Sequence, residues 1–215
     1  EWYEQAAAFA KYVTGKTVDE VKGIKLSDDG KATDADLSTS VTVSIAGYIE
    51  GIEKAVKNSK ELGAKAGDKL GLGIVTNIAK SKDAGEKDGI AQAYSNYGVV
   101  TVDNAGKITS ATIDASQTNV NFSKAGKITS DLTAQNMTKN ELGDDYGMKK
   151  ASSIGKEWYE QAAAFSKYVT GKTLDEVKGI KVEDGKATDT DLKASVTVGI
   201  ADYIAVISKA VGTAK

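Results

Sequence analysis

The sequence predicts an α+β fold in which helices pack on one side of an antiparallel sheet. Three observations predict this fold. Segments with strand character gather between residues 72 and 122, segments with helical periodicity follow them, and 22 glycines with no proline provide the turns. Strands followed by helices are typical of α+β domains, whereas alternating strands and helices would predict a parallel sheet.

A long segment of the sequence occurs twice. Residues Glu1–Val56 match Glu157–Val211 at about four positions in five, with one residue fewer near Asp29 in the second copy. A period near 155 residues is that of a duplicated domain and not of a solenoid. Two such domains would need about 310 residues, and the chain has 215. We therefore expect the C-terminal part of a first domain at 1–56, a linker at 57–70 and a complete second domain at 71–215.

The repeated segment begins with a predicted amphipathic helix. Its apolar residues are spaced three or four apart, and a glycine follows them at the place where a C-cap would end the helix: Trp2, Ala6, Phe9, Val13 and Gly15. Thr17 and Glu20 then form a capping box that opens a short second helix. A polar turn region follows, from residue 25 to residue 34.

The strands are predicted from alternating and β-branched residues in the middle of the chain. The expected elements are strands at 72–78, 92–102 and 108–115, a hairpin turn at 103–107, a possible fourth strand at 120–122 and a loop at 140–147.

One motif stands before the last helix of each copy. It reads Asp-Leu-Ser-Thr-Ser-Val-Thr from Asp36 to Thr42 and Asp-Leu-Lys-Ala-Ser-Val-Thr from Asp191 to Thr197. The apolar residues that follow predict a helix that begins at or just before the threonine, where free N–H groups and the helix dipole would suit a phosphate. The ordinary alternative is that each threonine is only a helix cap.

The pattern Asp-x-x-(Ser/Thr)-x-x-Thr resembles the flavinylation motif of the FMN-binding domain family. In that family a flavin transferase joins the phosphate of FMN to the last threonine as a phosphoester. The usual core is close to Ser-Gly-Ala-Thr, and this chain departs from it with 39–42 reading Thr-Ser-Val-Thr and 194–197 reading Ala-Ser-Val-Thr. The stretches at 100–108, 140–148 and 156–161 also resemble the family, and the last two resemble its tandem-domain members in Gram-positive bacteria.

The resemblance implies a set of site residues. Covalent FMN is expected on Thr197 and, in the partial copy, on Thr42, giving one FMN per complete domain and up to two in all. Asp36, Asp191 and Ser195 would belong to the motif that the transferase recognises. Three further residues are expected against the isoalloxazine ring or in the core beside it, namely Tyr146, Met148 and Trp158.

The resemblance also implies a function, which is that of an electron carrier and not strictly an enzyme. Its expected partners are a flavin transferase, a membrane quinone-linked electron donor, and ferric iron or another extracellular acceptor. The expected location is the outside of a Gram-positive cell, held by a lipid anchor that lies outside this sequence, together with a leader and the sheet of the first domain.

Composition excludes several kinds of chemistry. Because there is no cysteine and no histidine, disulfides, iron–sulfur clusters, Ser-His-Asp catalysis and most zinc sites are ruled out. The net charge is −2 without a basic cluster, which argues against a nucleic-acid partner.

Two other functions remain open. The first is a structural or adhesive surface repeat, and the second is a module that binds a small ligand without a covalent bond. In every case residues 1–56 would expose an apolar helical face, so we expect that segment to swap, to dock on another chain or to belong to a longer protein.

Overall fold

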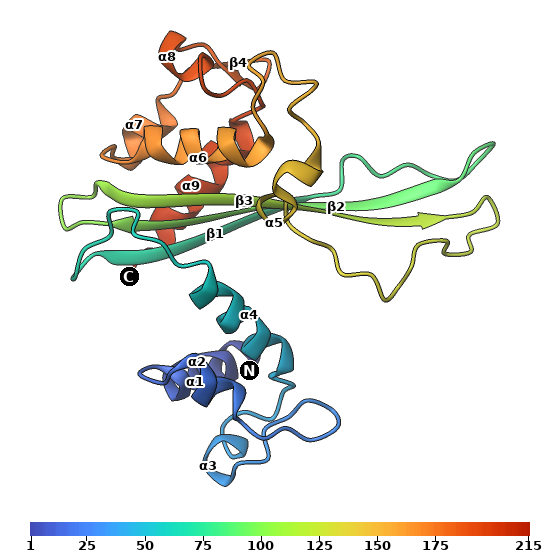
Figure 1. The fold of residues 1–215 in the computed structure, drawn as a ribbon, viewed down its shortest axis with the longest axis vertical. Helices are drawn as coiled ribbons and strands as arrows, with labels where there is room; N and C mark the ends of the chain where they lie inside the picture. Colours follow the sequence, from blue (N-terminus) through green and yellow to red (C-terminus); the bar gives the residue numbers. More distant parts are fainter. The chain divides into compact units, whose positions relative to one another are not determined.

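The computed structural model describes residues 1–215, which form two compact units, Glu1–Glu61 and Leu62–Lys215. Each unit has its own hydrophobic core. The first unit is helical, and the second combines a sheet with helices (Figure 1). No helix combines the length and the hydropathy needed to cross a bilayer.

A three-stranded antiparallel sheet forms the base of the second unit. Its strands are β1 (Lys69–Asn77), β2 (Gly89–Val102) and β3 (Ile108–Phe122), in the spatial order β1-β2-β3. The three predicted strands and the turn at 103–107 are present. The possible fourth strand is wrong, because residues 120–122 are the end of β3, which pairs with β2 as far as Gly89 and Phe122.

One face of this sheet is buried and the other is open. On the buried face Gly98 of β2 pairs with Gly73 of β1 and Ile113 of β3, and α6 and α9 contact these strands. On the opposite face Leu70, Leu72 and other apolar side chains are exposed. The fold is therefore α+β, with helices packed against one side of an antiparallel sheet, as predicted.

The helices of the second unit follow the sheet in the chain. They are α5 (Lys139–Leu142), the 3-10 helix η1 (Gly143–Tyr146), α6 (Trp158–Val169), α7 (Leu174–Lys178), α8 (Thr190–Lys193) and α9 (Ala201–Thr213), with a small hairpin of β4 (Val182–Glu183) and β5 (Lys186–Ala187). The expected loop at 140–147 is mostly helical instead. Thr138 and Glu141 form a capping box that starts α5, and this pairing explains the difference.

The helix α9 lies unusually close to the sheet because glycines face it. A Cβ atom on Gly71 would lie 1.9 Å from the carbonyl oxygen of Ala210, and one on Gly73 would lie 2.2 Å from that of Val206. Only glycine allows this approach, since real Cβ contacts are longer.

The first unit repeats the helices of the second. Its elements are α1 (Trp2–Val13), α2 (Val18–Lys22), α3 (Ala35–Ser38) and α4 (Ala46–Lys57), which correspond in sequence to α6, α7, α8 and α9. The predicted first helix ends as expected before Gly15, whose φ is +85°. The capping box of Thr17 and Glu20 is also present.

The predicted start of the last helix in each copy is wrong. The helix α4 begins at Ala46 and α9 at Ala201, four residues after Thr42 and Thr197. In both copies the N–H groups before the helix are bonded to other segments; that of Ile200, for example, donates to the Gly185 carbonyl at 2.7 Å. These bonds hold the backbone out of the helix. The threonine therefore does not lie at a helix N-terminus that could bind a phosphate.

Candidate functional site

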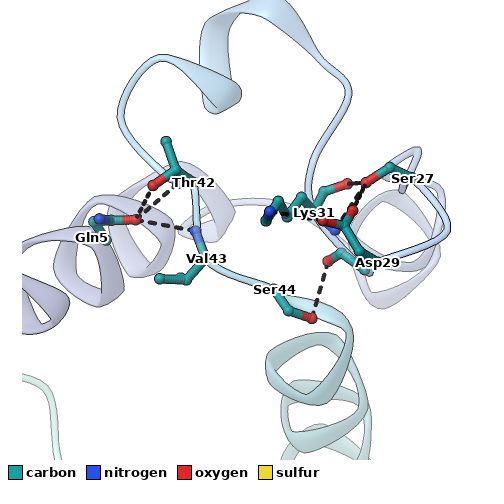
Figure 2. A network of polar contacts seen from close by, with 8 residues as sticks. Gln5, Ser27, Asp29, Lys31, Thr42, Val43 and Ser44 are labelled. Atoms are coloured by element: carbon teal, nitrogen blue, oxygen red, sulfur yellow. Dashed lines mark hydrogen bonds and ion pairs between the residues drawn. The ribbon is translucent and has the colours of Figure 1, made fainter.

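A glutamine holds the threonine of each motif. In the second unit Gln161 Oε1 accepts hydrogen bonds from Thr197 N at 2.8 Å, Thr197 Oγ1 at 3.2 Å and Val198 N at 3.2 Å. The first unit has the same three bonds at the same distances, from Thr42 and Val43 to Gln5 (Figure 2). The two motifs therefore have one local geometry.

The glutamine fixes the direction of the threonine hydroxyl. An amide oxygen can only accept, so the hydroxyl hydrogen of Thr197 points to Gln161 and the oxygen lone pairs face elsewhere. The Gln161 amide nitrogen donates in turn to Ser152 Oγ at 3.2 Å and to the Lys156 carbonyl at 3.3 Å. Gln161 positions the hydroxyl and has no basic group with which to deprotonate it.

Thr197 lines a hollow of about 320 Å³ on the surface of the second unit. The other walls come from the segment before α6, the β4–β5 hairpin and the residue after Thr197: Met148, Ala151, Ser152, Ser153, Lys186 and Val198. Two serine hydroxyls and one lysine suit a phosphate, because they offer hydrogen-bond donors and a positive charge.

A second pocket, of about 390 Å³, lies beside this hollow and shares Met148 and Val198 with it. Its aromatic walls are Tyr94, Tyr146, Trp158 and Tyr203. Its polar lining consists of Asn77, Lys80, Gln92, Asn96, Gln117, Lys139 and Asp202. Aromatic walls combined with placed polar groups are typical of small-molecule sites, and about half of the residues that line this pocket are polar.

Three of the residues that line this second pocket each have a buried polar atom with no hydrogen-bond partner. These atoms are Gln92 Oε1, Asn96 Oδ1 and the Tyr203 hydroxyl. The opposite ends of the two amides are fixed, since Gln92 Nε2 donates to Asn119 Oδ1 at 2.9 Å and Asn96 Nδ2 to Asp202 Oδ2 at 3.3 Å. Unpaired buried polar atoms are costly and uncommon, so these indicate a site for a ligand with its own hydrogen-bonding groups.

A lysine is buried among the aromatic rings of the pocket. Lys139 Nζ lies 4.7 Å from the Tyr146 ring centroid, 4.8 Å from that of Tyr94 and 5.0 Å from that of Trp158, and it donates to the Tyr94 hydroxyl at 3.1 Å. Burial lowers the pKa of Lys139 to about 8. Burial also raises the pKa of Tyr94 to about 12, so this hydroxyl stays neutral near pH 7.

The structure brings together four of the residues predicted from the sequence. Tyr146, Met148 and Trp158 line the aromatic pocket, and Thr197 lies in the adjoining hollow. Thr42 has the same glutamine contact but is exposed.

The remaining predicted residues stand apart from the two hollows. Asp36 and Asp191 are exposed in the first turn of a short helix, where Asp34 and Asp189 are the N-caps. The hydroxyl of Ser195 donates to the Leu192 carbonyl at 3.2 Å and lines neither hollow.

Sequence reasoning missed the glutamine and most of the polar pocket lining. Gln5 and Gln161 occupy the same place in both copies, so the repeat contained a signal for them. Lys139, Gln92 and Asn96 lie outside the repeat, and only the fold brings them to one pocket.

The chain is similar to a known protein over a short segment, and it matches no family model. No protein-family model and no solved structure match the chain. A protein named chlorophenol reductase, from Desulfitobacterium hafniense, is 51% identical over 41 residues, which are 19% of this chain and 12% of that protein.

Proposed function

We propose that this protein is an electron-transfer flavoprotein that carries FMN through a phosphoester bond to Thr197. In this proposal residues 71–215 hold an FMN-binding domain, within the compact unit Leu62–Lys215. Residues 1–61 hold the matching part of a duplicated first one, with Thr42 as a second attachment point. The ester joins the threonine Oγ to phosphorus, with loss of the elements of water.

One observation carries the proposal, namely that the motif threonine lies in a hollow adjoining an aromatic pocket. The hollow offers Lys186, Ser152 and Ser153 to a phosphate, and the pocket offers flat aromatic walls to a tricyclic ring. Gln92 Oε1 and Asn96 Oδ1 lack donors, and the imide N–H of an isoalloxazine ring is a donor that suits one of them. The residues therefore fit the group.

The side chains have defined tasks in this proposal. Gln161 orients the Thr197 hydroxyl for attachment, and the aromatic walls exclude water from one side of the ring. The bound flavin supplies reversible uptake of electrons, and the protein sets its environment.

The expected partners follow from this role. A flavin transferase installs the cofactor, a membrane quinone-linked protein donates electrons, and ferric iron or another extracellular acceptor receives them. We place the protein on the outside of a Gram-positive cell, bound by a lipid anchor. The short relative is named a reductase, and that name agrees with redox chemistry. The matched segment covers too little of the chain to carry the proposal.

The test is the intact mass of protein produced together with a flavin transferase. We expect a gain of one FMN less water on Thr197, lost in Thr197→Ala, and a second gain, lost in Thr42→Ala, if the exposed copy is also modified. Thr170→Ala is the matched control, since Thr170 bonds only to the Ser166 carbonyl at 3.0 Å and should keep the full mass.

Two outcomes would contradict the proposal. An unmodified mass, under conditions that modify a known target, would exclude the ester. A yellow protein that loses its colour on denaturation would instead favour the non-covalent binding module.

A further inference from the structure

Lys139 is a buried cation without a carboxylate partner. The residue is 5% exposed, and its ammonium contacts three aromatic rings and one tyrosine hydroxyl. The ion pairs of this structure lie elsewhere, on its surface. A buried charge that lacks an opposite charge destabilises a fold, so its presence in a pocket points to a task there.

Lys139 supplies a positive charge in the buried part of the pocket, and several ionisable groups lie near it. The ionisable groups near it are Asp114, Asp202, Glu157, Lys80, Tyr94, Tyr146 and Tyr203. Asp114 raises the Lys139 pKa and Lys80 lowers it, while burial has the largest effect. Each of the three tyrosines has a raised pKa and is neutral near pH 7.

The nearby carboxylates are engaged elsewhere. Asp202 accepts a bond from Asn96, Glu157 accepts the N–H groups of Met148 and Lys149, and Asp114 accepts those of Ala115 and Asn140. None of them forms an ion pair with the Lys139 ammonium.

We infer that Lys139 supplies a positive charge that favours the reduced form of a flavin ring held in this pocket. The inference rests on the proposed function and adds a residue to it. Oxidised flavin takes up two electrons and two protons to give a neutral reduced ring, or two electrons and one proton to give a ring with one negative charge. A cation beside the ring stabilises the second product over the oxidised form.

The first experiment measures the midpoint potential of the loaded protein at pH 7 in a titration with dithionite, a two-electron donor that is oxidised to sulfite. In Lys139→Met we expect the potential to fall by the equivalent of at least a tenfold change in the reduction equilibrium, about 30 mV for a two-electron couple. Lys139→Arg keeps the charge and should keep most of the potential. Lys167→Met is the control, because Lys167 is exposed on α6 away from both hollows, and its potential should not change.

The second experiment uses the unaltered protein and so does not depend on how a variant folds. A negative ring raises the pKa of Lys139, so this pKa is higher in the reduced protein than in the oxidised protein. At pH values between these two pKa values, reduction takes up one additional proton per two electrons. The plot of potential against pH should steepen in that interval, which begins near the pKa of Lys139.

The outcomes separate the two proposals. The role of Lys139 is overturned if the midpoint potential of the loaded protein is unchanged in Lys139→Met, or if the plot of potential against pH shows no added proton. Either result leaves the covalent flavin in place. An unmodified intact mass in the unaltered protein overturns the proposed function and the role of Lys139 with it.

Discussion

Gln161 shows how much of the site depends on a single side chain. Its amide connects α6 to the segment between α8 and α9 through three donors, and to the segment before α6 through two acceptors. The residue is fully buried, whereas Gln5 in the first unit is only partly buried. The same three motif contacts therefore carry a different energetic weight in the two copies, because desolvation strengthens the penalty for breaking them.

We predict that Gln161→Ala destabilises the second unit strongly. A buried donor left without an acceptor costs about 1–3 kcal/mol. The substitution leaves two backbone N–H groups and one hydroxyl without their acceptor. The measurement is urea unfolding followed by tryptophan fluorescence, in which Trp158 reports the second unit in a Trp2→Phe background and Trp2 reports the first unit in a Trp158→Phe background. Gln5→Ala is the matched control and should destabilise the first unit less, since water can reach its donors. Equal, small losses in both units would show that the glutamine contact contributes little.

At the scale of elements, the contact between α9 and the sheet decides where the motif lies. The helix packs on β1 and β2, and its preceding segment bears Thr197 and Val198. Glycines on the strands allow the helix backbone to come within van der Waals distance of the sheet. The place of the threonine thus depends on residues more than 100 positions away in the chain, such as Gly73.

We predict that Gly73→Ala lowers the stability of the second unit and reduces flavin attachment at Thr197. Its Cβ would lie 2.2 Å from the Val206 carbonyl oxygen and 2.7 Å from Ala210 N, so α9 must move. Overpacking of this kind costs about 1–3 kcal/mol. Gly212→Ala is the control, because nothing lies within 4 Å of its added Cβ and it lies within helix α9. It should leave the stability equal or raise it by up to about 1 kcal/mol. If both variants unfolded at the same urea concentration, the close approach would have no energetic role.

At the scale of the whole molecule, two nearly identical helical segments have different surroundings. Trp158 is 3% exposed and its ring meets Tyr203 edge-on at 5.9 Å, whereas Trp2, at the same place in the first copy, is 62% exposed. In the second unit a sheet covers the helices, and the first unit has no sheet of its own. The apolar helical face expected at residues 1–56 is exposed only in part, at Trp2 and Val56, because Phe9 and Ile49 are buried in the first unit's own core.

We predict that the two tryptophans report this difference directly. In Trp158→Phe the remaining Trp2 should emit at long wavelength and be quenched readily by acrylamide. In Trp2→Phe the remaining Trp158 should emit at shorter wavelength and resist quenching, because its ring is out of contact with water. Weak quenching of Trp2 would mean that its face is covered in solution, by a second chain or another partner, and dilution would then restore the quenching.

The sequence by itself determined the features that depend on neighbouring residues. The first helix with its glycine stop, the capping box at Thr17, the three main strands and their turn all follow from local periodicity and caps, and the repeat identified the two motifs. Covalent FMN, the electron-transfer role, the partners and the surface location stay predictions of a resemblance.

Only the tertiary structure decided where the last helix begins and what surrounds the threonine. Ile45 and Ile200 have helical spacing with the residues after them, yet their N–H groups bond to the carbonyls of Gly30 and Gly185, and the helix starts one residue later. Lys139 likewise has no local pattern that distinguishes it from a solvated lysine. Its place among three aromatic rings results from α5, η1, α6 and β2 meeting in space, and long-range packing of that kind leaves no trace in local periodicity.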